Sequence, residues 1–119
     1  MLWWHQELWM IDYGAALYFH HNWPNWRDSI SKPFVQIKDH VLLKDATMVE
    51  QIDQQYKKEF TRERIEEIIQ AIPSQWLEDI DESVSADQAR AVYLTFLTER
   101  LAQSEIFIRQ VDHARENLI

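Results

Sequence analysis

Between residue 45 and the end of the chain, apolar residues recur at three- and four-residue spacing in four successive runs. That spacing puts each run on one face of an α-helix, so it constrains the chain to a mainly α fold. Asp45 and Thr61 are expected to cap the first two helices, Ser85 with Gln88 forms a capping box before the third, and the fourth begins near Ser104. The predicted apolar faces are Val49, Ile52, Tyr56 and Phe60; Ile65, Ile68, Ile69 and Ile72, with Pro73 ending that helix; Ala89, Val92, Tyr93, Phe96, Leu97 and Leu101; and Phe107, Val111, Ala114 and Leu118.

The N-terminal part of the chain has a different pattern. The segments "LWW" and "LWMI" alternate and are rich in Trp and Ile, which predicts a short β-hairpin with its turn near His5, Gln6 and Glu7. Residues 15–21 are expected to be helical, and 22–34 to be loop with one helical turn. The segment "LEDIDESVSAD" is expected to connect two helices at the surface.

The length of 119 residues is that of one ordinary domain. We therefore predict a single domain over 1–119, comprising the hairpin and an Asp-x-Gly turn (1–14), a short helix and loop (15–44) and a helical bundle (45–119). Five of the six tryptophans lie within the first 26 residues, which is more apolar surface than a short segment usually hides by itself. This N-terminal segment is expected to need a partner surface.

Charge and composition exclude several classes of function. A formal net charge of -8 argues against binding to nucleic acid or to an anionic membrane. The chain has no cysteine, so it can form neither a disulfide framework nor a thiol nucleophile. No apolar stretch reaches the ~20 residues of a membrane span, and the start "MLWWHQELW" lacks the basic region of a signal peptide. These features predict a cytoplasmic protein.

The chain contains one glycine, Gly14, which follows Asp12 at the end of an apolar run. A strand that ends in Asp-x-Gly is the arrangement with which protein kinases hold magnesium, because the strand fixes the carboxylate and the glycine lets the backbone turn beneath the phosphates. Asp12 is therefore the candidate metal ligand and Gly14 the candidate cofactor-binding residue. The alternative is structural: Asp12 caps a helix that begins near Ala15, and Gly14 adopts a backbone conformation that other residues resist.

A longer segment around this motif points to one family. "LWWHQELWMIDYGAALYFHHNW", with "IKDHVLL" at 37–43 and "WLED" at 76–79, resembles the C-terminal part of HipA-like kinases, whose members carry a segment close to L-W-x-I-D-H-G-A-A-L-Y-F-H-H. The resemblance implies a helical kinase C-lobe-like fold and a magnesium role for Asp12. Tyr13 stands where the family usually has His.

The resemblance also implies which parts of a kinase this sequence lacks. In the family, a nucleotide-binding lobe and a catalytic loop precede this segment, whereas this sequence starts on the strand that leads to Asp12. Phosphoryl transfer needs several positioned groups, so we assign no catalytic residue and expect the chain alone to be inactive. Mg²⁺ and ATP are the cofactors expected of intact relatives, with neither bound tightly by this chain.

Two further predictions concern partners and histidines. Trp3, Trp4 and Trp9 are expected to mediate self-association, or docking of the missing kinase part, so a non-enzymatic interaction domain is the alternative function. Adjacent His20 and His21 point about 100° apart on a helix, which disfavours one shared ion. His40 is a candidate neighbour of Asp12, although packing or surface placement is favoured for every histidine.

Overall fold

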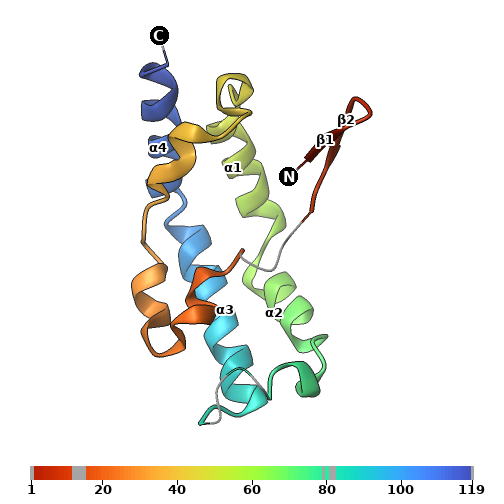
Figure 1. Ribbon diagram of the computed structural model, residues 1–119. Coiled ribbons are helices and arrows are strands. Elements are labelled where there is room, and N and C mark those ends of the chain that lie inside the picture. The colour runs from red at the N-terminus through yellow and green to blue at the C-terminus, as the bar shows by residue number, and fades with distance from the viewer. Residues whose placement is uncertain (1, 12–15, 79, 81–82, 119) are drawn as a thin grey trace.

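The computed structural model describes residues 2–11, 16–78, 80 and 83–118. Within these residues the chain is mainly helical, which confirms the predicted class. Four α-helices follow a short β-hairpin and a stretch of 3₁₀ helices, and the molecule is elongated, with extents of 49 × 32 × 26 Å. The bounds of the α-helices are α1 Val49–Glu59, α2 Arg62–Gln70, α3 Ala86–Ala102 and α4 Glu105–Glu116. Figure 1 shows α3 and α4 following one another along the length of the molecule, with α2 and α1 opposite them.

The N-terminal hairpin consists of β1 (Leu2–Trp4) and β2 (Glu7–Trp9), which pair antiparallel with Trp3 opposite Leu8. The second strand begins one residue earlier than the sequence predicts, because the turn consists of His5 and Gln6 alone. It ends at Trp9, two residues before the predicted end at Ile11. Both turn residues have positive φ, 51° and 64°. A two-residue hairpin turn needs such angles, and here residues other than glycine or asparagine adopt them.

Five 3₁₀ helices occur in the described residues: Tyr18–His21, Trp23–Ser29, Val35–Asp39, Leu43–Asp45 and Ser74–Trp76. In the described part of 15–21, the helix is 3₁₀ rather than α and begins only at Tyr18. The predicted loop at 22–34 contains more helix than one turn. Pro24 at the start of Trp23–Ser29 suits a helix N-terminus, because its missing N–H would have no intrahelical partner there.

One hydrophobic core joins α2 and α3 to the N-terminal 3₁₀ segments. Phe19 is its most buried large side chain and contacts the Phe96 ring at 4.5 Å between centroids. Leu77 also lies in this core, so the predicted surface connection at 77–87 is wrong at its first residue. The buried members of the core are Phe19, Trp23, Trp26, Ile30, Ile65, Ile69, Leu77, Ala89, Tyr93 and Phe96.

Two of the expected helix caps are present. The Thr61 hydroxyl accepts a hydrogen bond from the Arg64 N–H at the start of α2, and Ser85 and Gln88 form the reciprocal capping box of α3. The Asp45 prediction is wrong, because Asp45 ends a 3₁₀ helix and α1 begins at Val49 without a side-chain cap. The fourth helix begins at Glu105, next to the expected position.

The predicted apolar faces of α1 and α4 are not buried as expected. No residue of either helix is fully buried, and Ile52, Tyr56 and Phe60 along α1 are exposed. Leu118 is exposed too, beyond the end of α4. The two helices pack on one another, and α4 also packs on the segments Val35–Asp39 and Leu43–Asp45, so this part of the molecule is a thin layer with little core.

Candidate functional site

The hairpin exposes an unusual amount of apolar surface. We call residues 2–11 the Trp hairpin. Its six described large apolar side chains are 45–56% exposed: Leu2, Trp4, Leu8, Trp9, Met10 and Ile11. Figure 1 shows this hairpin projecting away from the helices, beside α1 and α2. Because the described sheet has two strands, each strand leaves one hydrogen-bonding edge without a strand neighbour among the described residues.

The side chain of Trp3, one of the predicted interaction residues, lies outside what the structure describes. The other four N-terminal tryptophans separate into two groups. Trp23 and Trp26 lie in the core, so the chain itself covers them. Trp4 and Trp9 are about half exposed. Trp23 and Trp26 therefore find the expected partner surface within the chain. Trp4 and Trp9 find none among the described residues.

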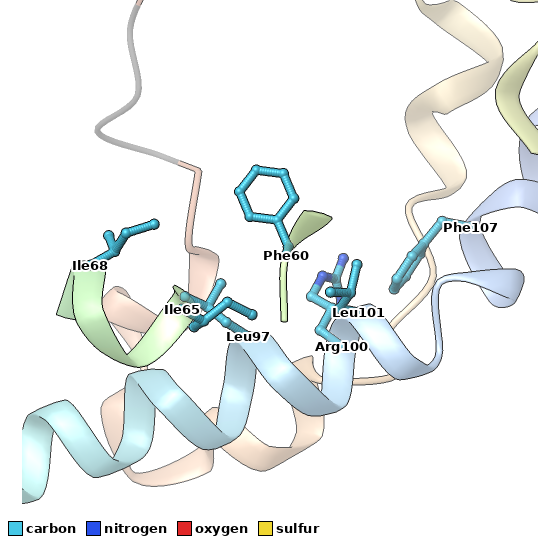
Figure 2. Close-up of a pocket in the computed structure, with 7 residues that line it drawn as sticks. All are labelled: Phe60, Ile65, Ile68, Leu97, Arg100, Leu101 and Phe107. Carbon is cyan, nitrogen blue, oxygen red and sulfur yellow. The ribbon is translucent and has the colours of Figure 1, made fainter. Parts of the chain in front are cut away.

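A second apolar surface lies between the helices. We call it the apolar cleft; it has a volume of about 390 Å³. Figure 2 shows its side chains in a row from Ile68 at one end to Phe107 at the other, with Phe60 between them. The lining comes from the chain after α1, from α2, from α3 and from α4: Phe60, Ile65, Ile68, Leu97, Arg100, Leu101 and Phe107. Arg100 is the one charged residue among these seven.

Arg100 is held beside Phe107 in this cleft by hydrogen bonds and a ring contact. Its Nη1 donates to the carbonyl oxygens of Ser29 (2.7 Å) and Ile30 (2.9 Å), which end the 3₁₀ helix Trp23–Ser29. Its guanidinium carbon lies 4.0 Å from the centre of the Phe107 ring, a cation–π geometry. Burial lowers the pKa of Arg100, because a charged group loses hydration there. Arg100 therefore joins α3 to the N-terminal segment and to α4.

The predicted metal and cofactor residues, Asp12 and Gly14, lie outside the described residues. Within the part of the chain that is described, no group of three or more His, Cys, Asp or Glu side chains is placed to hold a metal ion. His20 contacts the core, because its Nε2 lies 2.8 Å from the Tyr93 hydroxyl. His40 Nδ1 accepts a hydrogen bond from the Leu42 N–H at 3.2 Å. His20 and His40 thus have packing and hydrogen-bonding roles of the kind the sequence analysis favoured.

Sequence reasoning missed the apolar cleft and the role of Arg100. The only signal for the cleft was the width of the isoleucine face of α2. Ile68 makes this face wider than a helix needs when it is covered on one side. No local pattern marks Arg100, because its partners lie about 70 residues earlier in the chain.

Comparison with known proteins identifies no relative of this chain. No family model, curated protein or solved structure matches this chain. Among the described helices, none combines the length and apolar character needed to cross a bilayer.

Proposed function

We propose that this chain is the C-terminal helical lobe of a HipA-like kinase and that it acts as a protein-interaction module through the Trp hairpin. The observation that carries the proposal is the exposure of Trp4 and Trp9 on a two-stranded sheet that projects from the helices. Contiguous exposed apolar surface of this kind marks interaction sites, and open strand edges can pair with a further strand.

The charge of the hairpin supports an apolar contact. Residues 2–11 contain one acidic residue, Glu7, and no lysine or arginine, whereas the whole chain carries 20 acidic and 12 basic residues. A second copy of this acidic chain therefore meets little charge repulsion at the hairpin. In purified protein, where no other kinase part is present, the expected partner of the hairpin is therefore a second copy of it.

The kinase part of the proposal rests on the segment from Ile11 to His21, with Asp12 as the Mg²⁺ ligand and Gly14 as the backbone turn near the nucleotide. One carboxylate supplies few of the groups that phosphoryl transfer requires. The isolated chain is accordingly proposed to bind Mg-ATP weakly and to transfer no phosphate. Titration calorimetry with Mg-ATP tests this, and phosphotransfer by the purified chain would refute it.

Sedimentation velocity over a range of protein concentrations tests the interaction module. The unsubstituted chain is expected to self-associate, and the double variant Trp4→Ser/Trp9→Ser to do so at least about a hundredfold more weakly, because each buried Trp contributes roughly 2 kcal/mol. Trp76→Ser is the matched control, since Trp76 is 75% exposed but lies outside the hairpin. A monomeric unsubstituted chain, or equal association of all three proteins, contradicts the proposal.

A further inference from the structure

A second cavity also has Arg100 in its wall. It has a volume of about 540 Å³, within the range typical of small-molecule sites. Its walls come from Ala16, from the end of the 3₁₀ helix Trp23–Ser29 with the segment that follows it, and from the C-terminal half of α3. We call it the cationic cavity. The lining residues used in the argument below are Ser29, Lys32, Phe34, Gln36, Phe96 and Arg100.

The charge of this cavity is opposite to that of the chain. Lys32 and Arg100 are its charged residues among those described, in a protein of formal net charge -8. Neither has a described carboxylate within 4.0 Å. Lys32 is exposed, but Arg100 is half-buried, and burying a cation without a carboxylate partner is costly. An anion bound beside Arg100 would remove part of that cost.

Arg100 keeps hydrogen-bond donors that such an anion could use. Both protons of Nη1 are used by the carbonyl groups of Ser29 and Ile30, so the guanidinium plane is fixed. The other two nitrogens, Nη2 and Nε, have no hydrogen-bond partner among the described residues, and neither is a fully buried unsatisfied atom. One N–H from each of these two nitrogens can bind a carboxylate with two parallel hydrogen bonds.

The rest of the cavity favours a ligand with a flat apolar part. Phe96 is buried in the core, and Phe34 is half-buried, with its N–H donating to the Gln110 side chain at 2.8 Å. Both rings line the same cavity as the two cations. Ser29 and Gln36 add neutral polar groups at its wall.

We propose that the cationic cavity binds a small aromatic carboxylate. The carboxylate pairs with Arg100 and Lys32, and the ring lies between Phe34 and Phe96. This site is separate from the Trp hairpin, so it does not depend on the interaction proposed above.

The test uses amide chemical shifts of the isotopically labelled full chain, titrated with naphthoate and with its uncharged counterpart naphthylmethanol. Naphthoate is expected to shift the amides of Phe34 and Gln36 and to bind at least about tenfold more tightly than naphthylmethanol, because hydrogen bonds to a charged carboxylate are stronger than those to a neutral hydroxyl. Lys32→Ala should weaken naphthoate about tenfold and leave naphthylmethanol unchanged. Lys38→Ala is the control, because Lys38 is also exposed and lies six residues further along, outside the cavity.

Three results would overturn the proposal. The first is equal affinity of the Lys32→Ala and Lys38→Ala variants for naphthoate. The second is a set of naphthoate shifts confined to the Trp hairpin, which would mean that the probe only reports exposed tryptophan. The third is the absence of any Lys32-dependent shift up to the solubility limit of the probe.

Discussion

Helices α1 and α2 have the same kind of amphipathic sequence but different surroundings. In α2, Ile65 and Ile69 are buried against α3 and the N-terminal aromatic residues. In α1, Ile52 and Tyr56 stay exposed, and no residue is buried. The comparison teaches that a periodic apolar face shows which side of a helix is able to pack, while the number of elements that reach that side decides whether it does.

The same difference separates the two ends of the molecule. The end formed by α2 and α3 has capped helices and a core of large aromatic side chains. The end formed by α1 and α4 has no side-chain cap at either helix start and no fully buried residue within the helices. Regions with few buried apolar contacts open more readily than the rest of a protein, so α1 and α4 are expected to be the first helices to unfold.

The largest expected change in unfolding free energy comes from substituting one of two adjacent residues in α2. Ile69 is 2% exposed and Ile68 is 55% exposed on the same helix. Ile69→Ala is expected to lower the free energy of unfolding by ~2–5 kcal/mol, because it leaves a cavity in the core. Ile68→Ala is expected to change it by less than ~0.5 kcal/mol. Urea denaturation measures both, and similar losses would mean that the apolar cleft is closed in solution.

A smaller effect is expected at the helix starts. Ser85→Ala removes the capping box of α3 and should cost ~1 kcal/mol of unfolding free energy. Met48→Ala, at the start of α1, removes no side-chain cap and should change it by less than ~0.5 kcal/mol. Thermal denaturation of the two variants side by side is the measurement. A larger loss for Met48 than for Ser85 would break the distinction between the two ends.

The smallest effect concerns alkaline pH and the core tyrosine. Burial raises the pKa of Tyr93, since the ionised phenolate loses hydration there. The neutral hydroxyl is thus favoured in the folded state. Its contribution to stability is complete below the unfolded pKa of about 10, and it is lost as pH rises through the folded pKa. Tyr93→Phe should therefore show a shallower fall in unfolding free energy above about pH 10.

Tyr56→Phe is the control for that measurement, because Tyr56 lies on the exposed face of α1. It is expected to keep the alkaline fall of the unsubstituted chain. Denaturant titrations at a series of alkaline pH values test both variants. If the two variants behave alike, the buried tyrosine is not the source of the pH dependence.

The Trp hairpin and the cationic cavity differ in how far the sequence alone predicts them. The excess of tryptophan near the N-terminus indicated an exposed surface, but burial of Trp23 and Trp26 limits that surface to the hairpin. The cationic cavity had no such signal, because Lys32 and Arg100 are far apart in the chain and meet only when α3 packs on the segment after Ser29.

The sequence by itself determined the helical class, the hairpin and the caps at Thr61 and Ser85, because these depend on residues within a few positions of one another. Only the tertiary structure decided which apolar faces are covered, where Leu77 lies and what Arg100 binds. The physical reason is that burial and long-range hydrogen bonds depend on which elements meet. In this chain, α3 meets several others, whereas α1 has little beyond α4 to pack against.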